Sequence, residues 1–310
     1  MRWILLISAA LVVVLIWVEV GLRSRFGFGD PLLYVADDEI GYLLAPNQTV
    51  RRFGNRISIN QYSMRSAAIV ERTAERSPSV RVLMVGDSIV NGGWWTDQPE
   101  VLSEQVARQW DGIEVLNASA NSWGPRNELA YLKRFGCFEA QAIVLVINTD
   151  DLFATTPSPL VVGRDRNYPD RKPLLALIEV VQRYLLPAPK LPEAWQKIQK
   201  EGGDRVGANL EAIRQIQAIA TQANARFLLL LTPLLREVGQ PGSREYEIVA
   251  RQRLLALAQA NQSSYIDVLP LFNQASDPKA LYRDHIHLSP LGNSLLSAQI
   301  SQWMSQWINQ

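Results

Sequence analysis

The sequence has very few of the residues that build disulfides and metal centres. Cys137 is the only cysteine, so the chain cannot form an internal disulfide or a cysteine-based metal cluster. The only two histidines, His285 and His287, argue against a zinc site as well. We therefore expect a protein that works without a metal and without a cofactor.

An excess of either charge is also missing. The chain has 31 lysines and arginines against 30 aspartates and glutamates, a formal net charge of +1. It has no block of basic residues to bind phosphates, which argues against a nucleic-acid partner. Its 310 residues, 47% hydrophobic and 20% charged, have an ordinary globular composition with room for one large α/β domain and an appendage.

The N-terminus carries an apolar run, WILLISAALVVVLIWVEVGL (3–22), whose one charge is Glu19. About 20 residues of helix cross the hydrocarbon core of a bilayer. A cleaved signal peptide, the alternative, has a shorter apolar core and small residues at its cleavage site, whereas Val18, Val20 and Leu22 are bulky. The sequence therefore predicts an uncleaved transmembrane anchor over residues 1–22.

Positive charge flanks the anchor on both sides, so the positive-inside rule does not decide its orientation. We expect an extracytoplasmic domain only because soluble domains that follow an N-terminal anchor more often lie outside.

Residues 23–79 are a polar lead-in with a short strand or hairpin near 54–66, and 80–310 form the main domain. Within it, the proline-rich segment 153–205 is a lid, a binding loop or a neutral insertion.

The main domain alternates short apolar runs with helical patterns. Continuous apolar runs are typical of parallel strands that are buried on both faces. The runs are 81–85, 113–117, 142–148, 226–232 and 264–268, and helical spacing is found in 99–110, 209–224 and 244–261. Strand and helix in alternation predict a doubly wound, five-stranded parallel sheet.

Ligands bind such a sheet beyond the carboxyl ends of its strands. Gly86-Asp87-Ser88 follows the first strand, 117–124 (NASANSWG) follows the second, and 148–151 (NTDD) follows the third. DHIHLSPLG (284–292) follows the last strand. Serine, carboxylate and histidine gathered at one edge of a sheet indicate acyl transfer.

In that chemistry Ser88 would be the nucleophile, His287 the base and Asp284 the carboxylate that orients the base. Each residue also has a plain structural interpretation. Ser88 could be a turn residue or a helix N-cap, and His287 a hydrogen-bonded structural histidine. We expect His285 to be an exposed neighbour, and Ser289 to cap the helix that begins at Pro290.

The chain resembles the SGNH/GDSL hydrolase superfamily in VLMVGDSIVNG (82–92), in the asparagine-containing second corner, in VLVINTDDL (144–152) and in DHIHLSPLG (284–292). The resemblance implies a flavodoxin-like sheet with Ser88, His287 and Asp284 in the roles above. The anchor and lead-in are similar to bacterial envelope members, some of which handle acyl groups on polysaccharides.

The resemblance also implies an oxyanion hole. The Ser88 N–H is one expected donor, and the family's glycine N–H corresponds to Ser122, with Gly124 as the alternative. The family's third donor, an asparagine side chain, corresponds to Asp150, or to Asn148 after a two-residue slip. An ionised Asp150 about 4 Å from an oxyanion would cost about 4 kcal/mol, so Asn148 is the better candidate.

Three functions fit these residues. The first is a serine esterase that removes acyl groups, typically acetyl, from a carbohydrate or lipid-like substrate. The second is an envelope O-acyltransferase with the same three residues, and the third is a non-catalytic scaffold. Trp94, Trp95 and Trp123 follow two of the corners, where they either stack on sugar rings or pack in the core.

Overall fold

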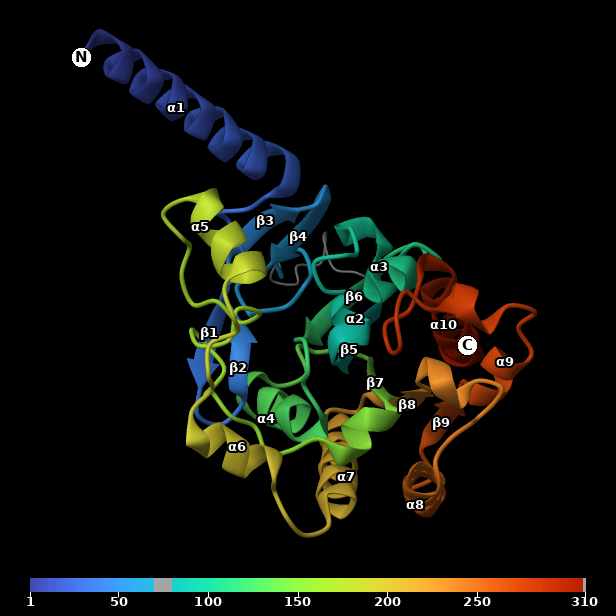
Figure 1. Cartoon of the computed structure of the whole chain (residues 1–310). Coiled ribbons are helices and arrows are strands. Elements are labelled where there is room, and N and C mark those ends of the chain that lie inside the picture. The colour runs from blue at the N-terminus through green and yellow to red at the C-terminus, as the bar shows by residue number, and fades with distance from the viewer. Residues whose placement is uncertain (70–79, 309–310) are drawn as a thin grey trace.

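A five-stranded parallel sheet forms the centre of the protein. The computed structural model describes residues 1–69 and 80–308 (Figure 1). In sequence order the strands are β5 (Val80–Gly86), β6 (Ile113–Ser119), β7 (Ala142–Asn148), β8 (Arg226–Thr232) and β9 (Ser264–Asp267). Their order in the sheet is β6-β5-β7-β8-β9. β5, the first of these strands in sequence, therefore lies between the second and the third, as in flavodoxin-like folds. The predicted fold class is confirmed.

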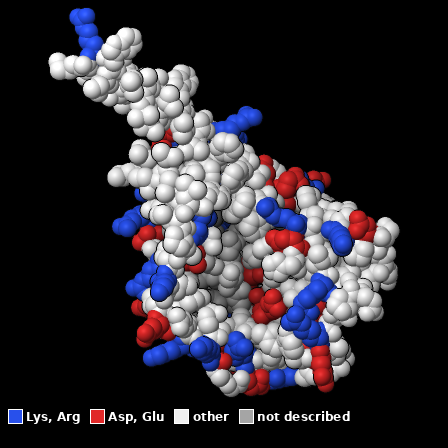
Figure 2. All heavy atoms as spheres, viewed as in Figure 1, with Lys and Arg blue, Asp and Glu red and all other residues white. Residues whose placement is uncertain are grey.

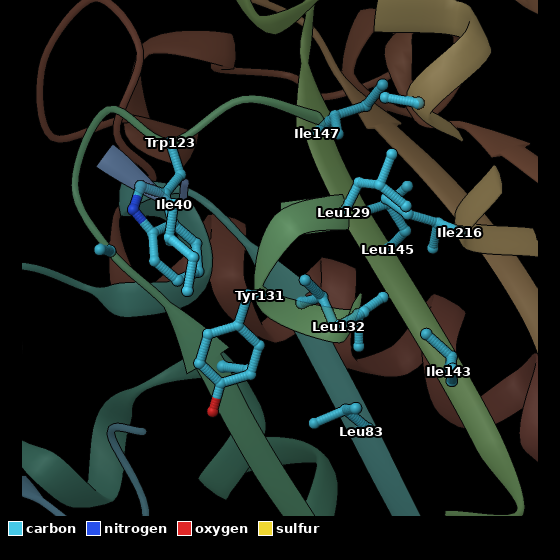
Figure 3. Close-up of a cluster of buried hydrophobic side chains, with 14 of the residues drawn as sticks. Ile40, Leu83, Trp123, Leu129, Tyr131, Leu132, Ile143, Leu145, Ile147 and Ile216 are labelled. Atoms are coloured by element: carbon cyan, nitrogen blue, oxygen red, sulfur yellow. The ribbon is translucent and has the colours of Figure 1, made fainter. Parts of the chain in front are cut away.

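Helices cover both faces of the sheet, and the two cores divide by the alternation of side chains along each strand. Leu83 and Val85 of β5 face α4 (Pro125–Phe135), α7 (Arg205–Gln222) and α8 (Glu245–Ala260). Val82 and Met84 face α2 (Ser88–Asn91), α3 (Leu102–Ala107), α9 (Leu269–Asn273) and α10 (Pro290–Ile308). Figure 3 shows the first core, where Leu129 of α4 lies close to Leu145 of β7 and Ile216 of α7.

The helix expected over 99–110 is shorter than its pattern predicts. A 3-10 turn over Gln98–Glu100 is separated from α3 by Val101, whose backbone is extended at φ −70° and ψ 152°. Pro99 is the second residue of this turn, a position where the missing backbone N–H is tolerated, so the helix is interrupted at Val101 and not at the proline. The predicted helices at 209–224 and 244–261 correspond to α7 and α8.

The lead-in is built into the domain core, which its polar composition does not suggest. It forms two antiparallel hairpins, β1 (Tyr34–Asp37) with β2 (Gly41–Leu44) and β3 (Gln48–Arg52) with β4 (Asn55–Ile59). Ile40, Ile57 and Met64 are completely buried in the same core as α4 and α7. The short strand or hairpin expected near 54–66 corresponds to β4, the second strand of the second hairpin, and residues 70–79 lie outside the described residues.

The insertion, 153–205, packs against these hairpins. It contains α5 (Ala176–Val180), followed by a π-helical turn over Val181–Leu185, and α6 (Glu193–Gln199). Tyr34 donates its N–H to the carbonyl of Pro169, and the Tyr168 ring lies 5.0 Å from the ring centroids of both Tyr34 and Tyr42. Hairpins and insertion thus form one wall beside the sheet.

Helix α1 (Arg2–Gly21) projects away from the domain (Figure 1). With the π-helical turn over Leu22–Phe26 it forms a candidate membrane span of 25 residues, and it buries none of its apolar side chains in the protein. Figure 2 shows it as a rod with basic atoms at its free end, acidic atoms where it meets the domain and an uncharged surface between them. Length and composition suit either a membrane anchor or a signal sequence.

Candidate active site

The Gly86-Asp87-Ser88 corner turns β5 sharply into α2. A Cβ on Gly86 would lie 2.6 Å from the carbonyl oxygen of Val146 and 2.5 Å from a methyl of Val90, so only glycine fits there. The Asp87 carboxylate accepts the N–H of Ile89 at 2.8 Å and caps α2. Asp87, and not Ser88, is the N-cap; Ser88 begins the helix with its hydroxyl at the end of the strand.

His287 joins Ser88 to Asp284. The Ser88 Oγ lies 2.9 Å from Nε2 of His287, and the Nδ1 of His287 lies 2.8 Å from Oδ2 of Asp284. The other oxygen of Asp284 accepts the backbone N–H groups of Ile286 and His287, at 3.0 and 2.9 Å. As expected, the Ser289 hydroxyl accepts the N–H of Gly292 and caps α10. The loop that carries His287 ends at this cap.

The charge of Asp284 decides where the imidazole proton lies. Partial burial acts to raise the pKa of Asp284, but hydrogen bonds from the backbone and ring of His287 and from Ile286 outweigh it and hold the pKa at about 2. The ionised carboxylate can only accept, so it places the proton of neutral His287 on Nδ1. Nε2 is then free to accept the proton of Ser88.

A tryptophan covers this imidazole. The ring centroid of Trp95 lies 4.4 Å from that of His287, and the Arg283 guanidinium lies over Trp95 at 4.9 Å. A Cβ on Gly93, whose φ is +52°, would lie 2.4 Å from the Trp95 ring, so the loop needs glycine there. The indole ring of Trp95 thus packs against the imidazole of His287. His285, with 84% of its side chain exposed, points to solvent.

The two expected backbone donors of the second corner differ in availability. Ser122 has a left-handed backbone, φ +60°, the conformation that glycine adopts most easily, and it lines the same cavity as Ser88. Within the described part of the chain, its N–H has no partner. The N–H of Gly124 is taken by the side chain of Asn127 at the start of α4. Ser122 is therefore the better match to the family's glycine.

The third expected donor has to be revised. The Nδ2 group of Asn148 donates to Asp87 and to Asp151, at 2.9 and 2.8 Å, so both of its hydrogens are already used. Asp150 is exposed, and its N–H donates to the oxygen of the Asn148 side chain. Asn148 thus braces Asp87 beneath the nucleophile and does not point toward it.

A cavity of about 320 Å³ lies in front of Ser88 and His287. Trp94 and Trp95 form one side, and Tyr34, Arg52, Tyr168 and Tyr184 of the hairpins and the insertion form the other. Figure 2 shows the surface hollowed between the part of the molecule with β1, β2 and the insertion and the part with the C-terminal half. Trp123, by contrast, is buried and donates to the carbonyl of Tyr42, so it packs in the core.

The family model of GDSL-like lipases and acylhydrolases matches residues 84–295, more than half of the chain. The chain belongs to this family.

Among solved structures, this GDSL-like acylhydrolase is similar to Axe2, an acetylxylan esterase from Geobacillus stearothermophilus, with 15% identity and a TM-score of 0.49 over 73% of this chain and 94% of that one. It is also similar to LAE5, an alpha/beta hydrolase from the metagenome of Lake Arreo, with 12% identity and a TM-score of 0.48 over 74% of this chain and 96% of that one. No curated protein matches the chain.

Two residues of the acylhydrolase site were not among those predicted from the sequence, although Asn121 lies within the second corner, 117–124. Asn121 lines the cavity beside Ser122, and its backbone carbonyl accepts the hydroxyl of Tyr42 at 2.7 Å. Arg65, from the lead-in, is completely buried and donates to the carbonyls of Asn91, Gly93 and Thr96 at 2.6, 2.5 and 2.5 Å. Arg65 thus shapes the loop that carries Trp94 and Trp95.

We expect Arg65→Met to destabilise the acylhydrolase by at least about 3 kcal/mol, since three carbonyls lose a charged donor and each unsatisfied group costs about 1–3 kcal/mol. Thermal unfolding in detergent micelles measures the loss. Arg56→Met, at an exposed position in β4, is the matched control and should leave the melting temperature nearly unchanged. Equal melting temperatures for Arg65→Met and Arg56→Met would show that Arg65 does not hold the loop.

Three carboxyl groups are buried behind the nucleophile: Asp87, Asp151 and Glu128. Burial raises the pKa of Glu128 well above its ordinary range, and the nearby Asp87 raises it further. Burial also raises the pKa of Asp151, with Asp87 and Glu128 adding to the effect. Among the described residues, neither carboxyl oxygen of Glu128 has a hydrogen-bond partner. The cluster therefore disfavours negative charge beneath Ser88.

A carboxyl whose pKa is raised by folding stabilises the protein below its ordinary pKa, near 4.5 for glutamate, and this stability is lost as the pH rises toward the folded value. Glu128→Gln keeps the shape and removes the titration. We expect it to raise the melting temperature at pH 8, by the equivalent of about 1–3 kcal/mol, and to change it little at pH 5. Equal changes at both pH values would contradict a buried carboxyl that resists ionisation.

Proposed function

We propose that this acylhydrolase is a membrane-anchored serine esterase in which Ser88 attacks the acyl carbon, His287 is the base and Asp284 orients it. The observation that carries the proposal is the continuous chain of hydrogen bonds from Asp284 through His287 to Ser88, at 2.8 and 2.9 Å. A serine hydroxyl is a weak nucleophile, and the positioned imidazole makes it competent by taking its proton during attack.

The reaction proceeds in two steps. Ser88 Oγ bonds to the ester carbonyl carbon while its proton moves to Nε2 of His287, and the carbonyl oxygen becomes an oxyanion. The N–H groups of Ser88 and Ser122 are its proposed donors, each worth about 10²–10³ in rate. His287 then protonates the leaving alcohol, and water activated by His287 releases the carboxylic acid from the acyl-Ser88 intermediate.

The lining of the cavity supports an acylated carbohydrate or lipid-like substrate. The exposed ring of Trp94 and the rings of Trp95, Tyr34 and Tyr168 offer flat apolar surfaces close to Ser88, which suit sugar rings and short acyl groups. We propose acetyl as the acyl group, since it is the typical one for the family, and the cavity of about 320 Å³ in front of Ser88 has room for it beside a sugar ring.

A second candidate function is an O-acyltransferase that passes the acyl group from Ser88 to a sugar hydroxyl. The hairpins and the insertion cover Ser88, of which only 7% is exposed. This cover favours the transferase, because exclusion of water promotes transfer over hydrolysis. The insertion would then act as the lid of the site.

We propose that α1 is an uncleaved anchor and that the domain lies outside the cytoplasm. The Glu19 carboxylate of α1 accepts the N–H groups of Ala176 and Leu177 in the insertion, at 2.7 and 3.1 Å. A signal peptidase cut after residue 22 would remove these bonds, whereas a retained helix uses them to fix the domain at the membrane.

The test uses the full-length protein in detergent micelles. We expect a serine-directed fluorophosphonate to label Ser88, as located by peptide mass spectrometry, and p-nitrophenyl acetate to be hydrolysed. Acetyl found on an added polysaccharide acceptor would establish the transferase. A folded protein with no label at Ser88 and no turnover would refute both enzymatic functions in favour of a non-catalytic scaffold.

A further inference from the structure

The segment 174–186 of the insertion exposes an unusual density of apolar side chains. Leu174 is 88% exposed and Leu185 is 73% exposed, the largest values among the apolar residues of the domain. The other exposed apolar residues of the segment are Leu175, Ile178, Tyr184 and Leu186. Contiguous apolar surface of this kind marks a site of contact with another apolar phase.

This segment is bound directly to the end of α1. Besides the two bonds from Ala176 and Leu177 to Glu19, the Arg23 guanidinium donates to the carbonyl of Leu174 at 3.0 Å and to Glu19 at 2.7 Å. Figure 2 shows uncharged surface that continues from α1 onto the region of α5. A membrane that surrounds the last turns of α1 therefore also contacts residues 174–186.

The charges around the segment fit the boundary of a bilayer. Its two charged residues are turned inward: Glu179 is buried and pairs with Arg52, and Arg183 is half-buried beside it. The exposed basic residues Arg171 and Lys172 come just before the segment in sequence, and the exposed Arg25 follows α1. Apolar side chains flanked by basic ones are the pattern of a segment that lies in the membrane interface.

We propose that residues 174–186 form a second membrane contact, in which their apolar side chains enter the headgroup boundary of the bilayer that α1 crosses. The proposal rests on the anchoring role of α1. Arg183 and Tyr184 of the segment also line the cavity in front of Ser88. The membrane contact and the wall of the active site are thus one piece of chain.

Site-directed spin labels test this in the full-length protein. In a Cys137→Ser background, single labels are placed at Leu174→Cys, Leu185→Cys, Leu11→Cys in α1 and Val249→Cys. Val249 is an apolar residue of α8 that is 49% exposed and lies outside the insertion, so it is the matched control. Collision rates with oxygen and with a water-soluble nickel chelate are measured in vesicles of phosphatidylcholine with a minor share of phosphatidylglycerol.

The expected result is an oxygen-to-nickel ratio at positions 174 and 185 that is several-fold higher than at 249 and approaches the ratio at position 11. Ratios at 174 and 185 equal to that at 249, with a high ratio at 11, would overturn the second contact and leave the anchor intact. A low ratio at position 11 would overturn the anchor, and the second contact with it.

Discussion

Ser88→Ala is expected to lower the turnover of p-nitrophenyl acetate by roughly 10⁴–10⁶-fold, the range that loss of an activated serine produces in serine hydrolases. The substitution removes the proposed nucleophilic oxygen, whose hydroxyl donates to Nε2 of His287. Binding and the backbone donors remain, so a small residual rate over water is expected. Initial rates of full-length protein in detergent micelles measure the effect.

The fold should not change, because Oγ makes only the bond to His287 and a longer one, 3.3 Å, to Asp87. Ser305→Ala is the matched control, since Ser305 is an exposed serine of α10 whose hydroxyl bonds only to the backbone of Gln302. We expect it to retain full activity. Ester turnover by Ser88→Ala that equals that of Ser305→Ala would refute the proposed nucleophile.

Asp284→Asn is expected to lower turnover by about 10⁴-fold through the tautomer of His287. The amide oxygen of the new side chain can keep the bonds from the N–H groups of Ile286 and His287. Its NH2 group then faces Nδ1 and donates to it, which moves the ring proton to Nε2. A histidine that carries a proton on Nε2 cannot accept one from Ser88.

The control for this change is His285→Gln, which removes the neighbouring exposed imidazole and should leave turnover unchanged. Thermal unfolding shows whether the substitution disrupts the turn at Asp284–His287 or only the tautomer of His287. We expect the melting temperature of Asp284→Asn to stay close to that of the unaltered protein. A loss of less than tenfold would mean that Asp284 does not orient the base.

The parallel sheet could be predicted because its central strands, β5, β7 and β8, are nearly continuous apolar runs buried on both faces. Ser88, Asp284 and His287 could be predicted as neighbours for the same reason, since parallel strands bring their carboxyl ends to one edge. The capping of α10 by Ser289 also follows from local sequence, because serine followed by proline is a strong helix start.

The contribution of the lead-in could not be predicted. Its strands are only four or five residues long, too short for a clear period, and Ile40 and Ile57 are buried by partners distant in sequence. The role of Asn148 could not be predicted either, for another reason. A sequence shows that an amide follows β7, but not that Asp87 and Asp151 already accept both of its hydrogens.

The hydrogen bond between Ser88 and His287 joins residues that are 199 positions apart in the chain. A contact of such high sequence separation forms late, because most of the sheet must assemble before the two ends of the site meet. α1 and the hairpins leave the ribosome first, while the base arrives only with the last part of the chain. With Ser88 as the proposed nucleophile, the growing chain would carry an unactivated serine until synthesis is nearly complete, and ester chemistry would begin only in the finished protein.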